Sequence, residues 1–203
     1  MFTPLFVAEI TLGALAMAHS AINTIIRITK AQAQFWGRAH GWAPIAAADL
    51  LAEARLDRQI AFTHTLHDYL TPFSLESAEA RQILGYTTLR SLCEGSLKLF
   101  FSVWFEDYRR DQDVVLDRQQ TLVLPEDIAF DRLIALYAKK GDSRFEPFLR
   151  RIQQRGNAIH HFSDRDIGTQ EELVVDIIEY NRFLLAVNGQ LPYPDGVYDP
   201  GQI

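Results

Sequence analysis

An arginine and two histidines lie close together in the last third of the chain. Arg155 is followed, five and six residues later, by the pair His160-His161. An arginine stays protonated at neutral pH and its planar fork fits a phosphate, whereas a histidine can take up and release a proton near neutral pH. Together, such residues can hold a phosphodiester and move a proton without a metal. The alternative is a polar helix end with no chemistry of its own.

The residues around this motif form a basic island in an acidic protein. Positions 139–165 hold seven lysines or arginines and three acidic residues, a difference of +4, whereas the whole chain carries −6. An acidic protein is a poor general binder of nucleic acid, and the one basic island contains the Arg-His motif. The alternative reading of the island is a solvated helix face.

Length, composition and cysteine content predict one globular domain in a reducing compartment. The chain has 203 residues, of which 48% are hydrophobic and 23% charged, and this is enough to bury a sizeable core. A single cysteine, Cys93, excludes an intrachain disulfide. We expect a cytoplasmic protein with one domain over residues 1–191. An irregular tail is expected over 192–203, where three prolines and two glycines occur.

Apolar residues recur at three- and four-residue steps through most of the chain, which predicts an all-α fold. Helices are expected over about 4–34, 44–69, 75–110, 125–141, from 144 into the motif, and 169–188. Thr169 and Glu172 form a capping box before the last helix, and positions 114–123 are ambiguous and could be extended. The first helix has an opposing polar stripe, so we expect it on a core or a partner helix rather than across a membrane.

Two further patterns carry weaker chemical signals. His64 and His67 lie three residues apart, but no third ligand at metal-site spacing accompanies them, so no metal site is expected. No phosphate-binding glycine loop occurs either, and no cofactor is expected. Arg90, Glu94 and Lys98 share one stripe of the helix over 75–110. They form either a structural ion-pair ladder or a support for the Arg-His site.

The segment Arg155-Gly-Asn-Ala-Ile-His-His-Phe-Ser-Asp-Arg-Asp-Ile-Gly168 resembles the motif region of the HEPN superfamily, whose members carry an Arg-x4-6-His motif. Both Arg155–His160 and Arg155–His161 fit that spacing. The resemblance covers about residues 86–188. It implies an all-α bundle of long antiparallel helices, usually a homodimer in which two motifs face each other across a cleft.

The resemblance also implies a metal-independent endoribonuclease of a toxin-antitoxin or phage-defence system, which leaves 2',3'-cyclic phosphate ends. Arg155 would stabilise charge on the phosphate oxygens, and Asn157 would orient the substrate or a histidine. His161 is favoured over His160 as the proton carrier, because it keeps the family's spacing from Asn157. Expected partners are RNA or a nucleotide, a second copy of the chain, and an antitoxin or regulatory protein.

One departure from the family pattern favours a different class of function. Gly156 follows Arg155, where the family usually has a polar residue. Residues five and six apart also lie about 140° and 120° apart around a straight helix, so they converge only if the helix breaks or a second subunit completes the site. The alternative is a non-catalytic HEPN-like module that binds a nucleotide, RNA or a protein. If the protein is a ribonuclease, Arg150 and Arg151 would contact the RNA backbone. A third hypothesis is a helical interaction protein in which the Arg-His motif occurs by chance.

Overall fold

The computed structural model describes residues 12–160 and 165–194, and the regular elements there are helical, as predicted. In chain order they are α1 (Leu12–Trp36), α2 (Ile45–Glu53), α3 (Leu56–Thr65), η1 (Leu66–Tyr69), α4 (Ala78–Val103), α5 (Phe105–Tyr108), η2 (Pro125–Asp127), α6 (Phe130–Lys140), η3 (Ser143–Phe145), α7 (Glu146–Gly156), η4 (Asn157–His160) and α8 (Gln170–Gly189). The predicted capping box is confirmed: the Thr169 hydroxyl accepts from the Glu172 backbone N–H, and the Glu172 carboxylate accepts from the Thr169 N–H.

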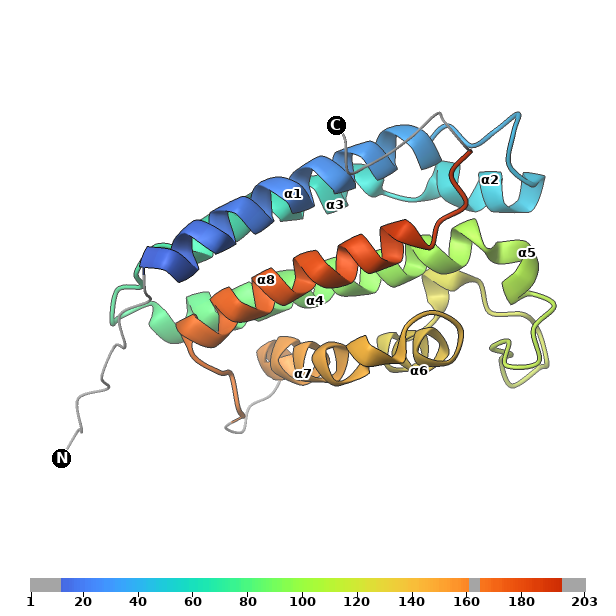
Figure 1. Ribbon diagram of the computed structural model, residues 1–203. Coiled ribbons are helices and arrows are strands. Elements are labelled where there is room, and N and C mark those ends of the chain that lie inside the picture. The colour runs from blue at the N-terminus through green and yellow to red at the C-terminus, as the bar shows by residue number, and fades with distance from the viewer. Residues whose placement is uncertain (1–11, 161–164, 195–203) are drawn as a thin grey trace.

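The three longest helices, α1, α4 and α8, run side by side in the same direction (Figure 1). Hydrogen bonds that link α4 to α8 show the parallel direction, because later residues of one helix pair with later residues of the other. The pairs are Tyr86 with Asp176, Ser96 with Tyr180, and, just after the two helices, Trp104 with Gln190. The expectation of long antiparallel neighbours is therefore wrong for these helices. The reason is that α2–α3 and α6–α7 are whole helical pairs that return the chain to the end where the next long helix begins.

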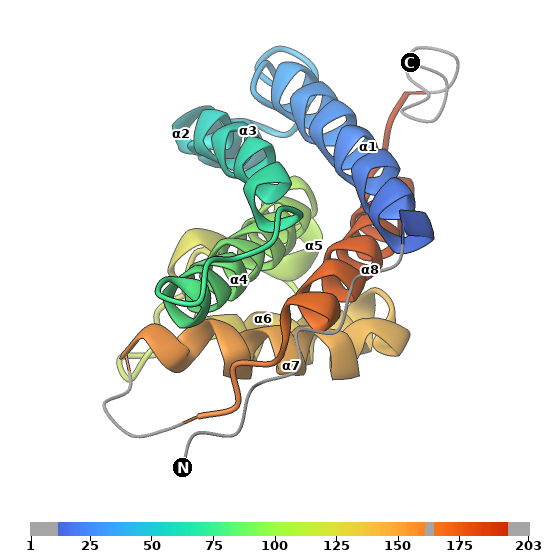
Figure 2. The same cartoon turned by 90° about the vertical axis from the view of Figure 1, so that its left-hand side faces the viewer.

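Helix α4 lies at the centre of the molecule. Seen end on, α4 and α8 form a middle layer, with α1–α3 on one side and α6 and α7 on the other (Figure 2). Its side chains Leu89, Leu92, Cys93 and Leu97 are fully buried in this core. Burial raises the pKa of the Cys93 thiol well above its usual range, so this cysteine behaves as a small core residue rather than a nucleophile.

Helix α1 packs along the protein rather than standing alone. Ile22, Ile25 and Ile28 are fully buried, and the Gln32 side chain donates a 3.0 Å hydrogen bond to Asn188 Oδ1 of α8. None of the helices in the described segments combines the length and the apolar character needed to cross a lipid bilayer. Ser20, Asn23 and Lys30 of the polar stripe are exposed, so this side of α1 faces away from the protein core.

Three of the expected helices are broken in the structure: the one over 44–69 between Glu53 and Leu56, the one over 125–141 between Asp127 and Phe130, and the one over 75–110 at Trp104. The helix expected over 75–110 breaks at Trp104, whose backbone leaves the helical region and whose indole N–H donates to the Gln190 carbonyl. The region 114–123 forms a tight connection with one isolated antiparallel bridge between Leu116 and Leu122. The break at Trp104 depends on a contact between segments that are distant in the sequence, whereas the Leu116–Leu122 bridge joins residues that are near one another.

Candidate functional site

Arg155 lies in the last turn of α7 and points into the interior between α4 and α8. Its side chain is only 7% exposed. Nη1 donates to the Tyr86 hydroxyl at 2.7 Å, and Nη2 donates to Glu172 Oε1 at 3.0 Å. Nε and Nη2 both donate to Asp166 Oδ2 at 3.3 Å. Every guanidinium nitrogen therefore has a protein acceptor, which is the arrangement expected of a buried charge.

Asp176 is the buried counter-charge of this cluster. Its side chain is 2% exposed and accepts hydrogen bonds from Arg151 Nη2 at 2.6 Å and from the Tyr86 hydroxyl at 3.0 Å. Arg155 Nη1 lies 3.6 Å from its second oxygen. Two arginines and a tyrosine thus share one carboxylate that has almost no contact with solvent. We refer to Tyr86, Arg151, Arg155, Asp166, Glu172 and Asp176 as the Arg155 network.

Three members of the network, Arg155, Tyr86 and Asp166, have pKa values shifted by their surroundings. Burial disfavours the charged form of Arg155, but Glu172 and Tyr86 outweigh it and raise the pKa above the ordinary value. Burial and then Asp176 raise the pKa of Tyr86 well above its usual range, so it remains a hydrogen-bond donor. The Gly168 N–H, with a smaller effect from Arg155, lowers the pKa of Asp166. Arg155, Tyr86 and Asp166 therefore cannot exchange protons near neutral pH.

Two glycines allow the chain to close around this network. Gly168 has a φ of +66°, and a Cβ there would lie 2.7 Å from Arg155 Cζ. Gly156 ends α7 against α4, where a Cβ would lie 2.6 Å from Arg90 Cβ and 3.0 Å from the Tyr86 carbonyl oxygen. The chain then continues as the 3-10 turn η4. The close packing of α7 on α4 therefore explains why a glycine occupies position 156, where the HEPN pattern usually has a polar residue.

Of the two motif histidines, only His160 lies in the described part of the chain, and its side chain is not joined to Arg155 there. His160 is exposed at the end of η4, and Asn157 is half-buried at its start. The Asn157 backbone N–H donates to the Arg155 carbonyl, but within the described residues no side-chain hydrogen bond or ion pair links His160 or Asn157 to the Arg155 guanidinium, whose partners are Tyr86, Asp166, Glu172 and Asp176. His161 lies outside the described residues, so its pairing with Arg155 stays a prediction.

The basic island is an ion-pair lattice rather than an unpaired patch. The predicted RNA-contacting residues are both engaged: Arg150 Nη2 lies 3.2 Å from Glu146 Oε1, and Arg151 binds Asp176. Other cations of the island are also paired: Lys139 with Asp113, Lys140 with Asp111 and Asp113, and Arg144 with Asp142. These pairs neutralise much of the positive charge that the sequence places in this region.

Arg90, Glu94 and Lys98 form the ion-pair ladder that was one of the two expectations. Glu94 lies 3.4 Å from Arg90 Nη2 and 3.0 Å from Lys98 Nζ, and all three side chains are partly exposed. The Arg90 guanidinium also lies over the Phe130 ring, 5.4 Å from its centroid. The ladder reaches the Arg155 network through the packing of Arg90 on Gly156, and no ion pair connects the two.

Four members of the network were missed by sequence reasoning. Tyr86 and Asp176 lie on apolar helix faces, and Asp166 and Glu172 lie in and after the polar connection. One signal was available: Asp176 shares the buried stripe of α8 with Leu173 and Tyr180. A carboxylate on such a stripe requires a cation, which identifies an arginine partner in principle.

Three histidines from α1, α3 and η1 lie close together. The rings of His19 and His67 stack with centroids 5.5 Å apart, and His64 lies close enough to affect His67 electrostatically. Within residues 12–160 and 165–194, no three histidine, cysteine, aspartate or glutamate side chains are arranged to hold a metal ion.

Comparison with known proteins leaves the family resemblance as a prediction. No family model, no curated protein and no solved structure matches this chain.

Proposed function

We propose that this chain is a non-catalytic HEPN-like helical module that binds a partner protein, with Arg155 as an internal anchor. The observation that carries the proposal is the burial of Arg155 and the engagement of all its guanidinium nitrogens by Tyr86, Asp166 and Glu172. A catalytic arginine must leave donors available where charge develops on the substrate. Arg155 instead satisfies a buried carboxylate and joins three helices.

Two surface properties favour a protein partner over RNA. Arg150 and Arg151 are paired with carboxylates, so they offer little free charge to phosphates. At the same end of the fold, large apolar side chains are exposed: Leu84 at 49%, Ile159 at 45% and Val175 at 58%. They come from α4, η4 and α8, the elements next to the Arg155 network. In this proposal, these three side chains supply apolar contacts for a partner protein or for a second copy of the chain.

A metal-independent endoribonuclease is the second candidate, and one observation favours it. Asp166 and Glu172, which accept hydrogen bonds from Arg155, have side chains that are 75% and 50% exposed, so solvent reaches this side of the ion-pair cluster. In the sequence, His161 lies between Arg155 and these two acceptors. The Arg155 cation is therefore close in the sequence to the proposed proton carrier. In this reading Arg155 stabilises phosphate charge, Asn157 orients the substrate, and His161 or His160 moves the proton.

Incubation of the purified protein with single-stranded RNA, with and without EDTA, separates the two functions. The ribonuclease predicts EDTA-resistant cleavage that leaves 2',3'-cyclic phosphate ends. Cleavage should be lost in only one of His160→Ala and His161→Ala, because neighbouring side chains point in different directions. The binding module predicts intact RNA with all three proteins.

Light scattering and a surface variant test the binding surface itself. A dimer has about twice the 23.2 kDa chain mass. The binding module predicts that Val175→Asp weakens self-association or capture of a partner and leaves the helical circular dichroism signal unchanged. Full retention of association and partner capture in Val175→Asp and Leu84→Asp argues against this surface.

A further inference from the structure

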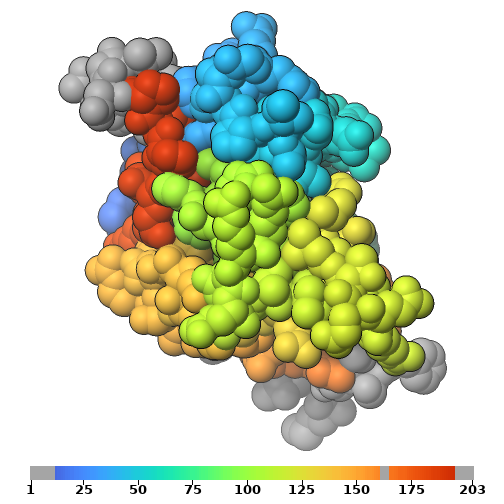
Figure 3. Space-filling model, turned by 90° about the vertical axis from the view of Figure 1, so that its right-hand side faces the viewer, coloured from blue at the N-terminus to red at the C-terminus, as the bar shows by residue number. Residues whose placement is uncertain are grey.

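A pocket lies at the other end of the molecule from the Arg155 network. Tyr86 and Phe100 are fourteen residues apart on α4, which is about 21 Å along a helix. The pocket has a volume of about 350 Å³. It lies where the C-terminal parts of α4, α6 and α8 come together, and these segments meet on the face shown in Figure 3. A volume of this size is at the lower end of the range of about 300–1,000 Å³ for small-molecule sites.

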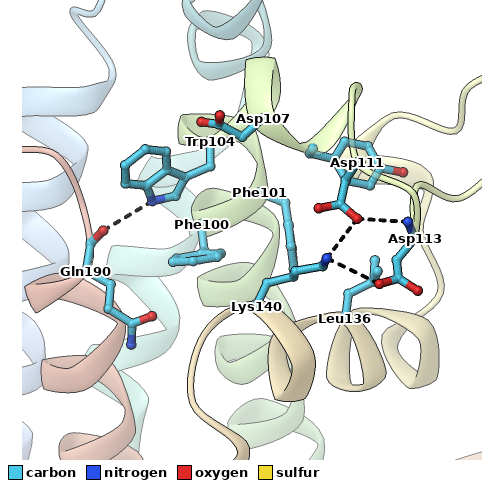
Figure 4. A pocket seen from close by; sticks show the side chains of 10 residues that line it. Phe100, Phe101, Trp104, Asp107, Asp111, Asp113, Leu136, Lys140 and Gln190 are labelled. Carbon is cyan, nitrogen blue, oxygen red and sulfur yellow. Dashed lines mark hydrogen bonds and ion pairs between the residues drawn. The ribbon is translucent and has the colours of Figure 1, made fainter.

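The walls of the pocket are aromatic. Phe100, Phe101, Trp104 and Tyr108 line it, and Leu136 of α6 adds an aliphatic surface (Figure 4). Perpendicular Phe100 and Phe101 rings have centroids 5.2 Å apart. These side chains come from a single stretch of α4 and α5, which bends at Trp104 and so turns several rings toward one space.

The polar tips of two wall residues are already satisfied by the protein. The Trp104 indole N–H donates to the Gln190 carbonyl at 3.1 Å. The Tyr108 hydroxyl donates to the Val123 carbonyl at 2.8 Å and accepts from the Val115 N–H at 3.2 Å. These bonds hold the two rings in place, and they leave the ring surfaces rather than the polar atoms for a ligand.

The rim of the pocket is negatively charged. Three aspartates line it against a single lysine, Lys140, which pairs with Asp111 at 2.8 Å and Asp113 at 3.2 Å (Figure 4). Asp107 is exposed, and its carboxylate makes no hydrogen bond or ion pair with any residue in the described segments. One carboxylate is thus left without a cation beside the aromatic walls.

Three helix ends add to this negative potential. Helices α4, α6 and α8 end at Val103, Lys140 and Gly189, and all three ends lie at the pocket. The C-terminal end of a helix carries a partial negative charge of about half a unit, which favours cations. An anionic ligand would meet both these ends and the aspartates, so a cation is the complementary ligand.

We propose that this pocket binds a small organic cation with an aromatic or aliphatic body. The body lies against Phe100, Phe101 and Leu136, and the ammonium group lies between the Asp107 carboxylate and the Trp104 ring face. Aromatic faces attract ammonium groups through their quadrupole, and tryptophan is the strongest of them. The site is independent of the Arg155 network and of the function proposed for it.

Three ligands of similar shape test the charge preference: 2-phenylethylammonium, neutral 2-phenylethanol and anionic 3-phenylpropionate. Binding is followed by NMR of the indole N–H signals of the three tryptophans, with Trp104→Phe used to assign the Trp104 signal. The amine should shift the Trp104 signal in a saturable way. The alcohol should bind about tenfold more weakly, and the carboxylate more weakly still.

Asp107→Asn tests the role of the unpaired carboxylate. It should weaken binding of the amine about five- to tenfold and leave binding of the alcohol unchanged. Asp131→Asn is the matched control, because Asp131 is an exposed carboxylate on α6, the helix that also supplies Leu136 and Lys140. Equal affinity for the three ligands, an unaffected Asp107→Asn variant, or no saturable shift with the amine would each overturn the proposal.

Discussion

Glu172 joins the start of α8 to Arg155 through the two oxygens of one carboxylate. Its Oε2 accepts from the Thr169 backbone N–H at 2.9 Å, and its Oε1 accepts from Arg155 Nη2 at 3.0 Å. The same side chain therefore completes a helix cap and one side of the Arg155 network. Local helix formation and the docking of α7 on α8 depend on one residue, and substitutions can separate the two contributions.

Loss of Arg155 should affect stability first. We expect Arg155→Ala to lower the free energy of unfolding by about 3–5 kcal/mol, because it leaves the buried Asp176 carboxylate with one fewer cation. Arg155→Lys should also cost about 2 kcal/mol or more, since an ammonium cannot reach Tyr86, Asp166 and Glu172 together. Urea unfolding measures both.

Arg150→Ala is the control for this prediction. Arg150 makes an exposed pair with Glu146 four residues earlier in the same helix, so its loss should cost about 1 kcal/mol or less. Equal costs at Arg150 and Arg155 would contradict a structural role for Arg155. Because Arg155→Ala is expected to perturb the fold, a loss of RNA cleavage in that variant would not by itself identify a catalytic arginine.

Substitutions at Glu172 should separate capping from ion pairing. Glutamine at this position of a capping box can still accept from the Thr169 N–H, so Glu172→Gln should lose mainly the charge interaction between the half-exposed Glu172 carboxylate and Arg155, about 0.5–1 kcal/mol. Glu172→Ala should cost about 1 kcal/mol more, because the cap is lost too. A double-mutant cycle with Arg155→Lys provides the measurement, and a coupling energy of zero would refute the shared role.

A side chain at Gly156 should push α7 away from α4. Gly156→Ala places a methyl group 2.6 Å from Arg90 Cβ, so we expect a loss of about 1–3 kcal/mol in thermal or urea unfolding. Gly189→Ala is the matched control, since a Cβ at that helical glycine meets no atom within 4 Å. It should be neutral or stabilising by up to about 1 kcal/mol. The opposite order of the two variants would contradict the close packing.

The histidine cluster should make stability depend on pH. Burial, followed by His19 and His64, lowers the pKa of His67 below its ordinary value, and the opposing effect of Asp68 is smaller. The unfolded chain then binds more protons at this position, so the contribution is complete above a pH of about 6.5 and is lost as the pH falls through the folded pKa. An NMR titration of His67 checks the direction, and a midpoint at or above 6.5 would be inconsistent with it.

Features that depend on nearby residues were predictable from the sequence. Helical periodicity predicts the all-α fold, and the capping box at Thr169 and the ladder at Glu94 rest on spacings of three and four residues. Such spacings bring side chains together within one helix, whatever the rest of the chain does. The same logic cannot say that α1, α4 and α8 run in parallel, because that depends on how far the intervening helices carry the chain.

The two sites depend on contacts between distant segments, and this is why the sequence reveals them only in part. Arg155 looks like a free cation until Tyr86 and Asp176, from two other helices, are placed around it. The pocket likewise needs Trp104 beside Gln190, although the aromatic residues of α4 read simply as an apolar face. A pattern identifies which residue types are present, whereas the packing of helices decides which of their atoms remain available.

The pairing of α1 with α8 has a consequence for how the chain folds during synthesis. Gln32 and Asn188, which are hydrogen-bonded, lie 156 residues apart in the sequence. The face of α1 that packs on α8 therefore leaves the ribosome long before its partner exists. Contacts of such high sequence separation form late and slow the folding rate. We therefore expect α1 to be the helix that most needs protection from aggregation in the nascent chain.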